Sequence, residues 1–396
     1  MTIRIAHFAD THLGFRQYGL IDRENDFYDS FENIIDDMIE KNVDYVIHSG
    51  DLFEHYKPPI KALLCAQKGF LRLIENGIKV IVIAGNHDIV QKKETSIPQE
   101  LYENENFIIL NHKNRTYEIN EDTVIAGIQF IRKSYEETVK QILYQIKEDV
   151  QEYRHKILML HGAIRKYFEI NPEFELDTIP EGFDYYAMGH IHERKLEKDF
   201  KGGILSYPGS TDIRDKAENN DYELNGKGYN LLTIDDEINV EYVNVPLERK
   251  FIIKNIKYPE LDKRLDEIES LIKKDILTKY EKKPLLIINV NEGDFDRSEV
   301  LQKVEDKLED LSLTIRLTYS PTEVIDPGEG DSETPNLDAD ELIIKHLEEY
   351  EDDSISNLGL DLYKTLSKKN IEEAEEISDS FYKKHYYNIE GKENDN

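Results

Sequence analysis

Five short polar motifs constrain the fold of this chain most, because each follows an apolar, strand-like run at its C-terminal end. The motifs are Asp10-Thr-His12, Gly50-Asp51, Gly85-Asn86-His87-Asp88, His161-Gly162 and Gly189-His190-Ile-His192. Side chains at the strand ends of an open α/β sheet leave the core and converge on one crevice. Together the motifs offer seven oxygen and nitrogen ligands, which suffice for a two-metal centre that cleaves a phosphoester.

Residues 1 to about 235 alternate strand-like runs with amphipathic helical patterns, which predicts a layered α/β domain. The segment from Glu24 to Lys41 carries one apolar stripe and is expected to cover a sheet. A second helix is predicted from Pro59 to Asn76, because proline favours a helix start and Gly77 follows its end. Its broad apolar arc indicates burial against the sheet and a second subunit, or deep burial within one chain.

The remainder of the chain carries no ligand motif. Residues 239–320 are predicted to form a small α+β unit, and residues 321–340 form an acidic linker rich in Pro and Gly. Residues 341–396 hold short helical patterns whose apolar faces are too small for a core of their own. These helices are expected to dock onto the body of the protein or onto a partner.

The formal net charge of −32 argues at first against a nucleic-acid partner, because phosphate binding needs a basic footprint. The charge is uneven, since residues 321–396 hold 22 Asp+Glu against 7 Lys+Arg. Basic residues such as Arg16, Lys57 and Arg194 follow the motifs, although each of them could equally be part of a solvated surface. Two divalent cations would add about four positive charges at the same place. The acidic composition therefore does not exclude a phosphodiester substrate.

Cysteine content and hydropathy limit the class of protein further. The single cysteine, Cys65, excludes an intrachain disulfide and a thiolate zinc cluster. No apolar stretch reaches about 18 residues, and no charged-then-apolar leader is present, so a cytoplasmic protein without a membrane partner is expected. His7 and His48 lie inside predicted strands and are expected to be core or supporting groups.

In their order along the chain, the five motifs resemble those of the calcineurin-like metallophosphoesterase superfamily over residues 3 to about 212. Gly50-Asp51-Leu-Phe53 and Tyr207-Pro-Gly-Ser210 further resemble the repair-nuclease branch, the archaeal meiotic-recombination-eleven type related to bacterial SbcD. The resemblance implies a four-layer α-β-β-α sandwich over residues 1–238 and a capping, DNA-recognition domain over residues 239–320. It also implies that the helices in residues 341–396 bind an ATPase subunit.

The resemblance also implies a role for each motif residue. One metal would be held by Asp10, His12, Asp51 and His192, and the other by Asp51, Asn86, His161 and His190. Asp51 would bridge the two. Mixed nitrogen and oxygen ligands suit Mn²⁺, Fe²⁺ or Zn²⁺ better than Mg²⁺, and the family implies two Mn²⁺ ions per subunit.

His87 matches the catalytic histidine of the family, which contacts the phosphate or protonates the leaving oxygen without holding a metal. Asp88 is a candidate partner for the second ring nitrogen of His87, and an exposed position for Asp88 is the alternative. Glu54 stands where some relatives have a second phosphate-contacting histidine, and the neighbouring His55 is a candidate for that role.

The function implied is that of a manganese-dependent DNA nuclease in double-strand-break repair, a 3′-to-5′ exonuclease and endonuclease with a two-metal mechanism. A phosphomonoesterase or cyclic-nucleotide phosphodiesterase is the alternative enzyme. Leu52 to Tyr56 replace the Asp-Arg-Gly continuation typical of protein phosphatases, which disfavours that branch. A non-catalytic DNA-end scaffold would be expected to lose ligands, and all seven are present.

The partners implied are double-strand DNA ends, single-stranded DNA, a second copy of the chain and a coiled-coil, SMC-like ATPase of the radiation-sensitivity-fifty type. The chain has no Gly-x-x-x-x-Gly-Lys-Ser/Thr loop, so any ATP dependence would come from the other subunit. The expected location is cytoplasmic and nucleoid-associated.

Overall fold

The computed structural model describes residues 2–90, 96–168 and 172–320, together with 358–359, 361–365, 377–378 and 380–381. The chain divides into two compact units, Met1–Glu323 and Val324–Asn396. Within the described residues, every helix is too short or too polar to cross a membrane.

A six-stranded sheet forms the first half of the N-terminal domain. Its strand order is β12-β11-β1-β2-β3-β4, with parallel pairing from β1 to β4 and antiparallel pairing of β11 with its neighbours. The strands are β1 (Ile3–Phe8), β2 (Tyr45–Ser49), β3 (Lys79–Ile83), β4 (Phe107–Ile109), β11 (Gly228–Ile234) and β12 (Ile238–Asn244). Helices α1 (Ile21–Glu40) and α2 (Ile60–Glu75) pack on its outer face through residues such as Phe31 and Phe70.

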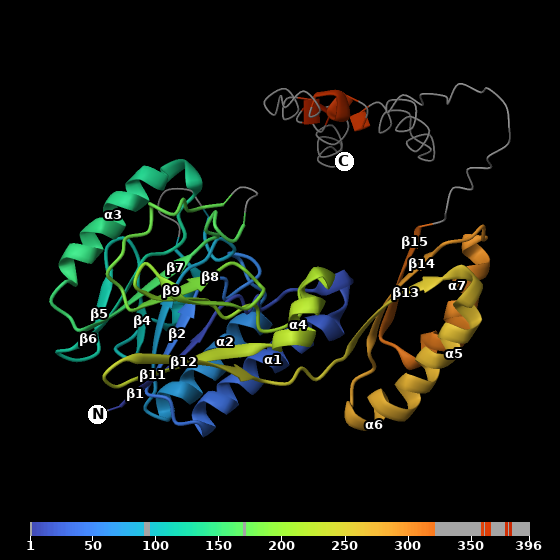
Figure 1. Cartoon of the computed structure of the whole chain (residues 1–396), viewed down its shortest axis with the longest axis horizontal. Coiled ribbons are helices and arrows are strands. Elements are labelled where there is room, and N and C mark those ends of the chain that lie inside the picture. Colours follow the sequence, from blue (N-terminus) through green and yellow to red (C-terminus); the bar gives the residue numbers. More distant parts are fainter. Residues whose placement is uncertain are drawn as a thin grey trace, which may run out of the picture. The chain divides into compact units, whose positions relative to one another are not determined.

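A second six-stranded sheet has the order β5-β6-β7-β8-β10-β9. Its strands are β5 (Thr116–Glu118), β6 (Thr123–Gly127), β7 (His155–His161), β8 (Tyr185–Gly189), β9 (Lys195–Phe200) and β10 (Gly203–Tyr207). Helix α3 (Glu136–Asp149) covers the outer face of this sheet through Val139, Leu143 and Ile146. Figure 1 shows α3 on the opposite side of the two sheets from α1 and α2.

A layer of apolar side chains joins the two sheets face to face. Ile47 and Ile81 of the first sheet pack in one cluster with Ile157 and Met159 of the second. Strand β1 shows the alternation that this requires, because Ile5 joins the layer between the sheets while Ala6 faces the helices. The predicted four-layer α-β-β-α sandwich is thus confirmed.

The two helices predicted before residue 80 are present, and α1 begins three residues earlier than the predicted start at Glu24. Helix α2 buries one side against the sheet, whereas Leu64 is 58% exposed and Leu71 48% exposed. Deep burial of this helix within one chain is therefore wrong, and its outer apolar face is open.

A smaller sheet lies beyond the sandwich, with three parallel strands in the order β13-β14-β15. The strands are β13 (Phe251–Lys257), β14 (Leu285–Asn291) and β15 (Thr314–Ser320), and the helices are α5 (Leu261–Leu271), α6 (Leu277–Lys279) and α7 (Arg297–Leu308). Leu265 and Val304 of the helices pack with Ile288 of the sheet in a separate core. Strand β12 pairs with β11 along its whole length, so the first sheet continues to Asn244, beyond the boundary expected at residue 238.

Short helical turns connect the larger elements. They are η1 (Gln17–Gly19), η2 (Pro98–Tyr102), η3 (Lys133–Tyr135), η4 (Lys216–Glu218), α4 (Asn219–Asn225), η5 (Tyr258–Glu260), the π-turn η6 (Ile272–Ile276) and η7 (Glu309–Leu311). Helical backbone is described at residues 358–359, 361–365, 377–378 and 380–381. The predicted linker and the other residues of the C-terminal helical stretches lie outside the described residues.

Candidate metal centre

The backbone turns into an unusual conformation where the motifs leave their strands. Asp10, His12, Asp51 and His190 all have positive φ angles, of 55°, 45°, 56° and 96°. Such angles are uncommon for residues other than glycine and cost about 1–3 kcal/mol each, so they persist only where the surrounding structure imposes them. Their concentration at the ends of β1, β2 and β8 marks this edge of the sheets as a candidate functional site.

Two motif glycines allow the strand ends to approach each other. A Cβ atom on Gly50 would lie 2.4 Å from Nδ1 of His161, and Gly50 also has a φ angle of 94°. A Cβ atom on Gly85 would lie 2.2 Å from Oδ1 of Asp51. Any side chain at either position would therefore collide with a predicted ligand, which explains why glycine precedes Asp51 and Asn86.

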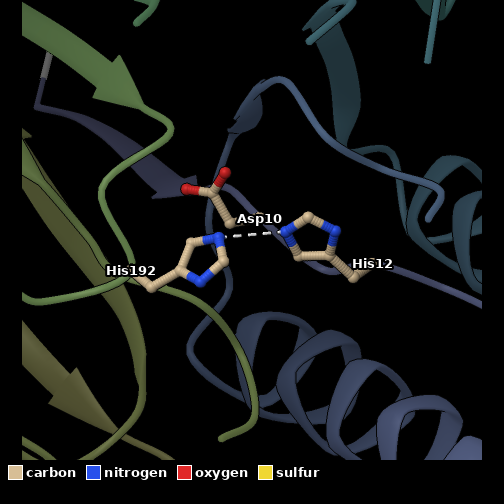
Figure 2. A group of neighbouring side chains, drawn as sticks. All are labelled: Asp10, His12 and His192. Atoms are coloured by element: carbon tan, nitrogen blue, oxygen red, sulfur yellow. Dashed lines mark hydrogen bonds between the residues drawn. The ribbon is translucent and has the colours of Figure 1, made fainter. Parts of the chain in front are cut away.

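Asp10, His12 and His192 form the first group of candidate metal ligands (Figure 2). One ligand atom from each lies within 4.8 Å of the others, and the Nε2 atoms of His12 and His192 are 3.1 Å apart. Both carboxylate oxygens of Asp10 accept from the backbone N–H of His190 at 3.0 Å. Two strands of different sheets, β1 and β8, thus deliver their motifs to one point.

Asp51, His161 and His190 form a second group within the same 4.8 Å limit. Oδ1 of Asn86 lies 3.0 Å from Nε2 of His161 and 3.0 Å from Nδ1 of His190. Oδ2 of Asp51 lies 3.3 Å from Nε2 of His161 and 3.9 Å from Nε2 of His12. Asp51 is therefore placed between the two groups, and the structure brings all seven predicted ligands together.

Carboxylates and a carbonyl hold the outer nitrogens of three histidines. Nδ1 of His192 donates to Oε1 of Glu218 at 3.0 Å, and Nδ1 of His161 donates to the carbonyl of Ser49 at 2.8 Å. Nδ1 of His12 lies 3.0 Å from Oε2 of Glu54, close enough for the carboxylate to attract a proton on this nitrogen, although the contact lacks the geometry of a regular hydrogen bond. Hydrogen bonds thus keep a proton on Nδ1 of His192 and of His161, and the Glu54 carboxylate favours one on Nδ1 of His12, so the Nε2 lone pairs point into the site.

The donor set fits a divalent cation. Two Nε2 lone pairs facing each other at 3.1 Å repel unless a positive charge lies between them. Burial opposes protonation of His161, but the Asp51 carboxylate outweighs burial and raises the pKa of His161 to about 9. Burial likewise opposes protonation of His192, and Glu218 raises the pKa of this histidine. Protonation is thus favoured at these two histidines only, because burial lowers the pKa of His12 to about 4 and that of His190 to about 3.

His87 lies at the rim of the site, with 26% of its side chain exposed. Its backbone N–H donates to Oδ1 of Asp51 at 2.9 Å, and its Nδ1 atom donates to the carbonyl of Glu54 at 2.8 Å. The proton on Nδ1 leaves Nε2 as the ring atom able to exchange a proton with a substrate.

The sequence left two alternatives for Asp88, a contact with the ring of His87 or an exposed position, and both are wrong. Asp88 is fully buried and accepts backbone N–H groups of Leu52, Phe53 and Gly85 at 3.2, 2.9 and 2.9 Å. Burial and the nearby Asp51 charge raise the pKa of Asp88 to about 7. Asp88 therefore ties the loops after β2 and β3 to each other.

His7 and His48 are fully buried, which confirms them as core groups. Nδ1 of His7 lies 2.8 Å from the Tyr185 hydroxyl, and burial lowers the pKa of both histidines to about 3. His55, the candidate for a second phosphate contact, has an exposed side chain.

Three charged residues around the site, Arg214, Glu218 and Lys227, could not be recognised from the sequence. Lys227 is buried and donates to Oε2 of Glu218 at 2.7 Å, and Arg214 donates to Oε1 of Glu54 at 2.9 Å. Arg214 and Glu218 lie in connecting segments and Lys227 directly precedes β11, where charged side chains are ordinarily solvated. Only the contacts in the folded chain distinguish them from surface residues.

Comparison with known proteins agrees with this geometry. The model of the family described as calcineurin-like phosphoesterase matches residues 3–194. The DNA double-strand break repair protein Mre11 of Methanococcus maripaludis is 35% identical over 323 residues, which cover 80% of this chain and 84% of the relative.

Two further relatives carry the same name. The Mre11 protein of Methanocaldococcus jannaschii is 35% identical over 385 residues, which cover 95% of this chain and 97% of the relative. The Mre11 protein of Sulfolobus acidocaldarius is 34% identical over 291 residues, which cover 73% and 75% of the two chains. The chain belongs to the Mre11 family of calcineurin-like phosphoesterases.

Proposed function

We propose that this protein is a manganese-dependent DNA nuclease that processes ends in double-strand-break repair, as a 3′-to-5′ exonuclease on duplex DNA and as an endonuclease. The observation that carries the proposal is the position of Asp51 between two ligand groups, 3.3 Å from His161 and 3.9 Å from His12. A carboxylate in this position suits a pair of cations about 3.5–4 Å apart, the spacing found in two-metal nucleases. The names of the Mre11 relatives support double-strand DNA ends as the substrate.

Each predicted ligand receives a role in this proposal. Asp10, His12, Asp51 and His192 would hold one Mn²⁺, and Asp51, Asn86, His161 and His190 would hold the other. Bound Mn²⁺ ions would activate water as the nucleophile and neutralise charge on the phosphate. With three uncharged imidazole and amide donors around Asp51, the second group contributes little negative charge to repel a phosphodiester.

His87 is the proposed proton donor to the leaving 3′ oxygen. The Nδ1 atom of His87 donates a hydrogen bond to the Glu54 carbonyl, and its backbone N–H donates to the Asp51 carboxylate. These two hydrogen bonds hold both the ring and the backbone of His87 in place. Histidine suits this role because its ordinary pKa is close to neutral.

We propose a homodimer through the open face of α2, where Ile60, Leu64 and Leu71 are exposed on one helix. Exposed apolar side chains grouped on one helix mark an interaction surface when the opposite face is already buried. The coiled-coil ATPase of the radiation-sensitivity-fifty type is proposed to bind residues 341–396, most of which lie outside the described residues.

One experiment separates the proposed nuclease from the alternative enzymes. Blunt duplex DNA labelled at its 3′ ends is incubated with the protein in Mn²⁺, in Mg²⁺ or in chelator, and a chromogenic phosphomonoester and a cyclic nucleotide are tested in parallel. We expect loss of label in Mn²⁺, and a decrease of about 10²–10⁴-fold in the His87→Ser variant, typical of a lost general acid.

The matched control is Mn²⁺ binding by the same variant in calorimetry, which should equal that of the wild type because His87 holds no metal in this assignment. Rapid hydrolysis of the monoester or cyclic nucleotide with intact DNA would favour the alternative enzyme. No hydrolysis of any substrate by Mn²⁺-loaded protein would favour the non-catalytic scaffold.

A further inference from the structure

Glu54 directly follows the Gly50-Asp51-Leu-Phe53 segment, at the position where some relatives have a phosphate-contacting histidine. Its side chain is buried and points inward. Oε2 lies 3.0 Å from Nδ1 of His12, and the backbone carbonyl of Glu54 accepts from Nδ1 of His87 at 2.8 Å. One residue thus contacts both a proposed metal ligand and the proposed proton donor.

The two imidazoles held by Glu54 also contact each other. The ring centroids of His12 and His87 are 4.9 Å apart with an interplanar angle of 89°, so the edge of one ring meets the face of the other. A shift of Glu54 would therefore displace both rings, because its carboxylate contacts one and its carbonyl the other.

Arg214 holds the Glu54 carboxylate from the opposite side. Nη2 of Arg214 donates to Oε1 at 2.9 Å, and Nε donates to Oε2 at 3.3 Å. The guanidinium carbon lies 4.9 Å from the ring centroid of Phe15, and the Arg214 carbonyl accepts from Gln17 at 2.8 Å. Such a two-point contact fixes a carboxylate plane better than a single contact would.

We propose that Glu54 is a positioning residue with Arg214 as its counter-ion. Its carboxylate keeps the proton of His12 on Nδ1, and its two contacts hold the rings of His12 and His87 in place relative to each other. The assignment of roles to the two histidines rests on the proposed function, whereas the placement of the His12 proton does not. A buried carboxylate at this position would repel a phosphate. Glu54 therefore does not contact the substrate and acts only by positioning the two histidines. The exposed His55 does not take over the missing phosphate contact in this arrangement.

The first test locates the His12 proton in the metal-free protein. Proton–nitrogen NMR of protein labelled in its histidine rings, with His12 assigned by a His12→Gln variant, should find the proton on Nδ1 in the wild type. In Glu54→Ala it should move to Nε2, because the ring nitrogen that carries the proton follows the available acceptor. Wild-type protein with the proton on Nε2 would overturn the proposal, whatever the protein binds or cleaves.

The second test measures Mn²⁺ affinity by calorimetry. We expect affinity to fall about 10–100-fold in Glu54→Ala, as for other groups that orient metal ligands. Glu54→Gln retains an acceptor oxygen and should lie between the alanine variant and the wild type, which a purely structural role for the side chain would not produce. Arg214→Gln should lower affinity less than Glu54→Ala does, because it removes only the counter-ion.

The matched control is Glu24→Gln, which changes another buried glutamate paired with an arginine but far in sequence from the motifs. Oε2 of Glu24 accepts from Nε of Arg16 at 2.7 Å, and no ligand histidine contacts it. Its Mn²⁺ affinity and His12 proton should match the wild type. Equal affinity in Glu54→Ala and Glu24→Gln would overturn the positioning role.

A third measurement separates this role from a general loss of activity. In saturating Mn²⁺, phosphodiester hydrolysis by Glu54→Gln should recover to within about tenfold of wild type, because its carbonyl still holds His87. A variant that binds Mn²⁺ as tightly as the wild type yet loses activity would place Glu54 in contact with the substrate and overturn the proposal.

Discussion

Nε2 of His12 and Nε2 of His192 face each other at 3.1 Å, and each ring turns its Nδ1 atom toward a glutamate, Glu54 or Glu218. Neither Nε2 atom can donate to the other while both protons remain on Nδ1. The arrangement is therefore favourable only with a positive charge at the Nε2 atoms, which links the stability of the domain to its metal content.

Mn²⁺ should accordingly raise the melting temperature of the protein. A ligand that binds only the folded state at 100 times its Kd adds about 2.7 kcal/mol per site to the free energy of unfolding. Calorimetric scans with Mn²⁺ and with chelator measure this difference. The Asp51→Asn variant, which loses the shared carboxylate, should respond much less, and equal melting temperatures of wild type in both buffers would contradict the prediction.

Gly85→Ala should abolish Mn²⁺ binding. The new Cβ atom would lie 2.2 Å from Oδ1 and 2.3 Å from the backbone nitrogen of Asp51, so the loop and the carboxylate must move apart. Overpacking of this kind costs about 1–3 kcal/mol of stability. Gly77→Ala is the control, because nothing lies within 4 Å of its Cβ position and any cost there comes from its positive φ angle of 79° alone. If Gly85→Ala binds Mn²⁺ as the wild type does, the close approach is not required.

The sequence allowed prediction that the seven candidate ligands lie together, because each stands where an apolar run ends and parallel strands bring such ends to one edge. The pairing of His12 with Glu54 and of His192 with Glu218 could not be predicted in this way. His192 and Glu218 are 26 residues apart, and only the path of the chain through β9 and β10 brings them together. The predicted contact between Asp88 and the ring of His87 was wrong for a related reason, since residues adjacent in sequence can point their side chains in different directions.

Helix and strand periodicity predicted the layers, because Ile5 and Ala6 must face opposite sides of a sheet. Periodicity did not indicate that β12 returns to the first sheet, since its residues alternate between buried and exposed as those of an edge strand do. The boundary between the sandwich and the small domain depends on which strands pair, and strand pairing is seen only in the folded chain.

Lys227→Met should destabilise the protein by about 3–5 kcal/mol, the usual cost of leaving a buried charge without its partner. Lys227 donates to Glu218 at 2.7 Å, to the Ser210 hydroxyl at 2.7 Å and to the His192 carbonyl at 3.1 Å. Denaturant unfolding of Lys227→Met, Glu218→Gln and the double variant measures the coupling. The double variant should be more stable than the sum of the single changes predicts, and simple additivity would contradict a direct ion pair.

Asp26 should make the contact between α1 and the small domain sensitive to acid. Arg23, Arg249 and Lys282 all contact its carboxylate, at 2.6, 2.5 and 3.0 Å. Burial alone would raise the pKa of Asp26, but Arg249 and Arg23 outweigh burial and hold this pKa below its ordinary value of 3.8. The folded state therefore favours the charged form.

A lowered pKa in the folded state means that the stabilisation is complete above the unfolded pKa and is lost as pH falls through the folded pKa. Wild-type protein should thus lose stability from about pH 4 downward, and Asp26→Asn should lose less over that range while being less stable at neutral pH. Denaturant unfolding at a series of pH values tests this. Parallel curves for the two proteins would show that Asp26 does not contribute.

Charge placed on the open face of α2 should convert the proposed dimer to a monomer. Leu64 is 58% exposed and Leu71 is 48% exposed, while Phe70 and Leu73 of the same helix are buried. A Leu64→Glu, Leu71→Glu variant would put two carboxylates into an apolar interface, where unpaired charges are strongly unfavourable. Light scattering at micromolar concentration should report a dimer for the wild type and a monomer for the variant.

The control for this prediction is Leu224→Glu, which changes a leucine that is 83% exposed on α4 and outside the proposed interface. It should remain dimeric, because adding charge at an already solvated position removes no burial. Mn²⁺ binding should survive in both variants, since no ligand lies on α2. A monomeric wild type, or a dimer that persists in the α2 variant, would mean that the apolar face of this helix serves another partner.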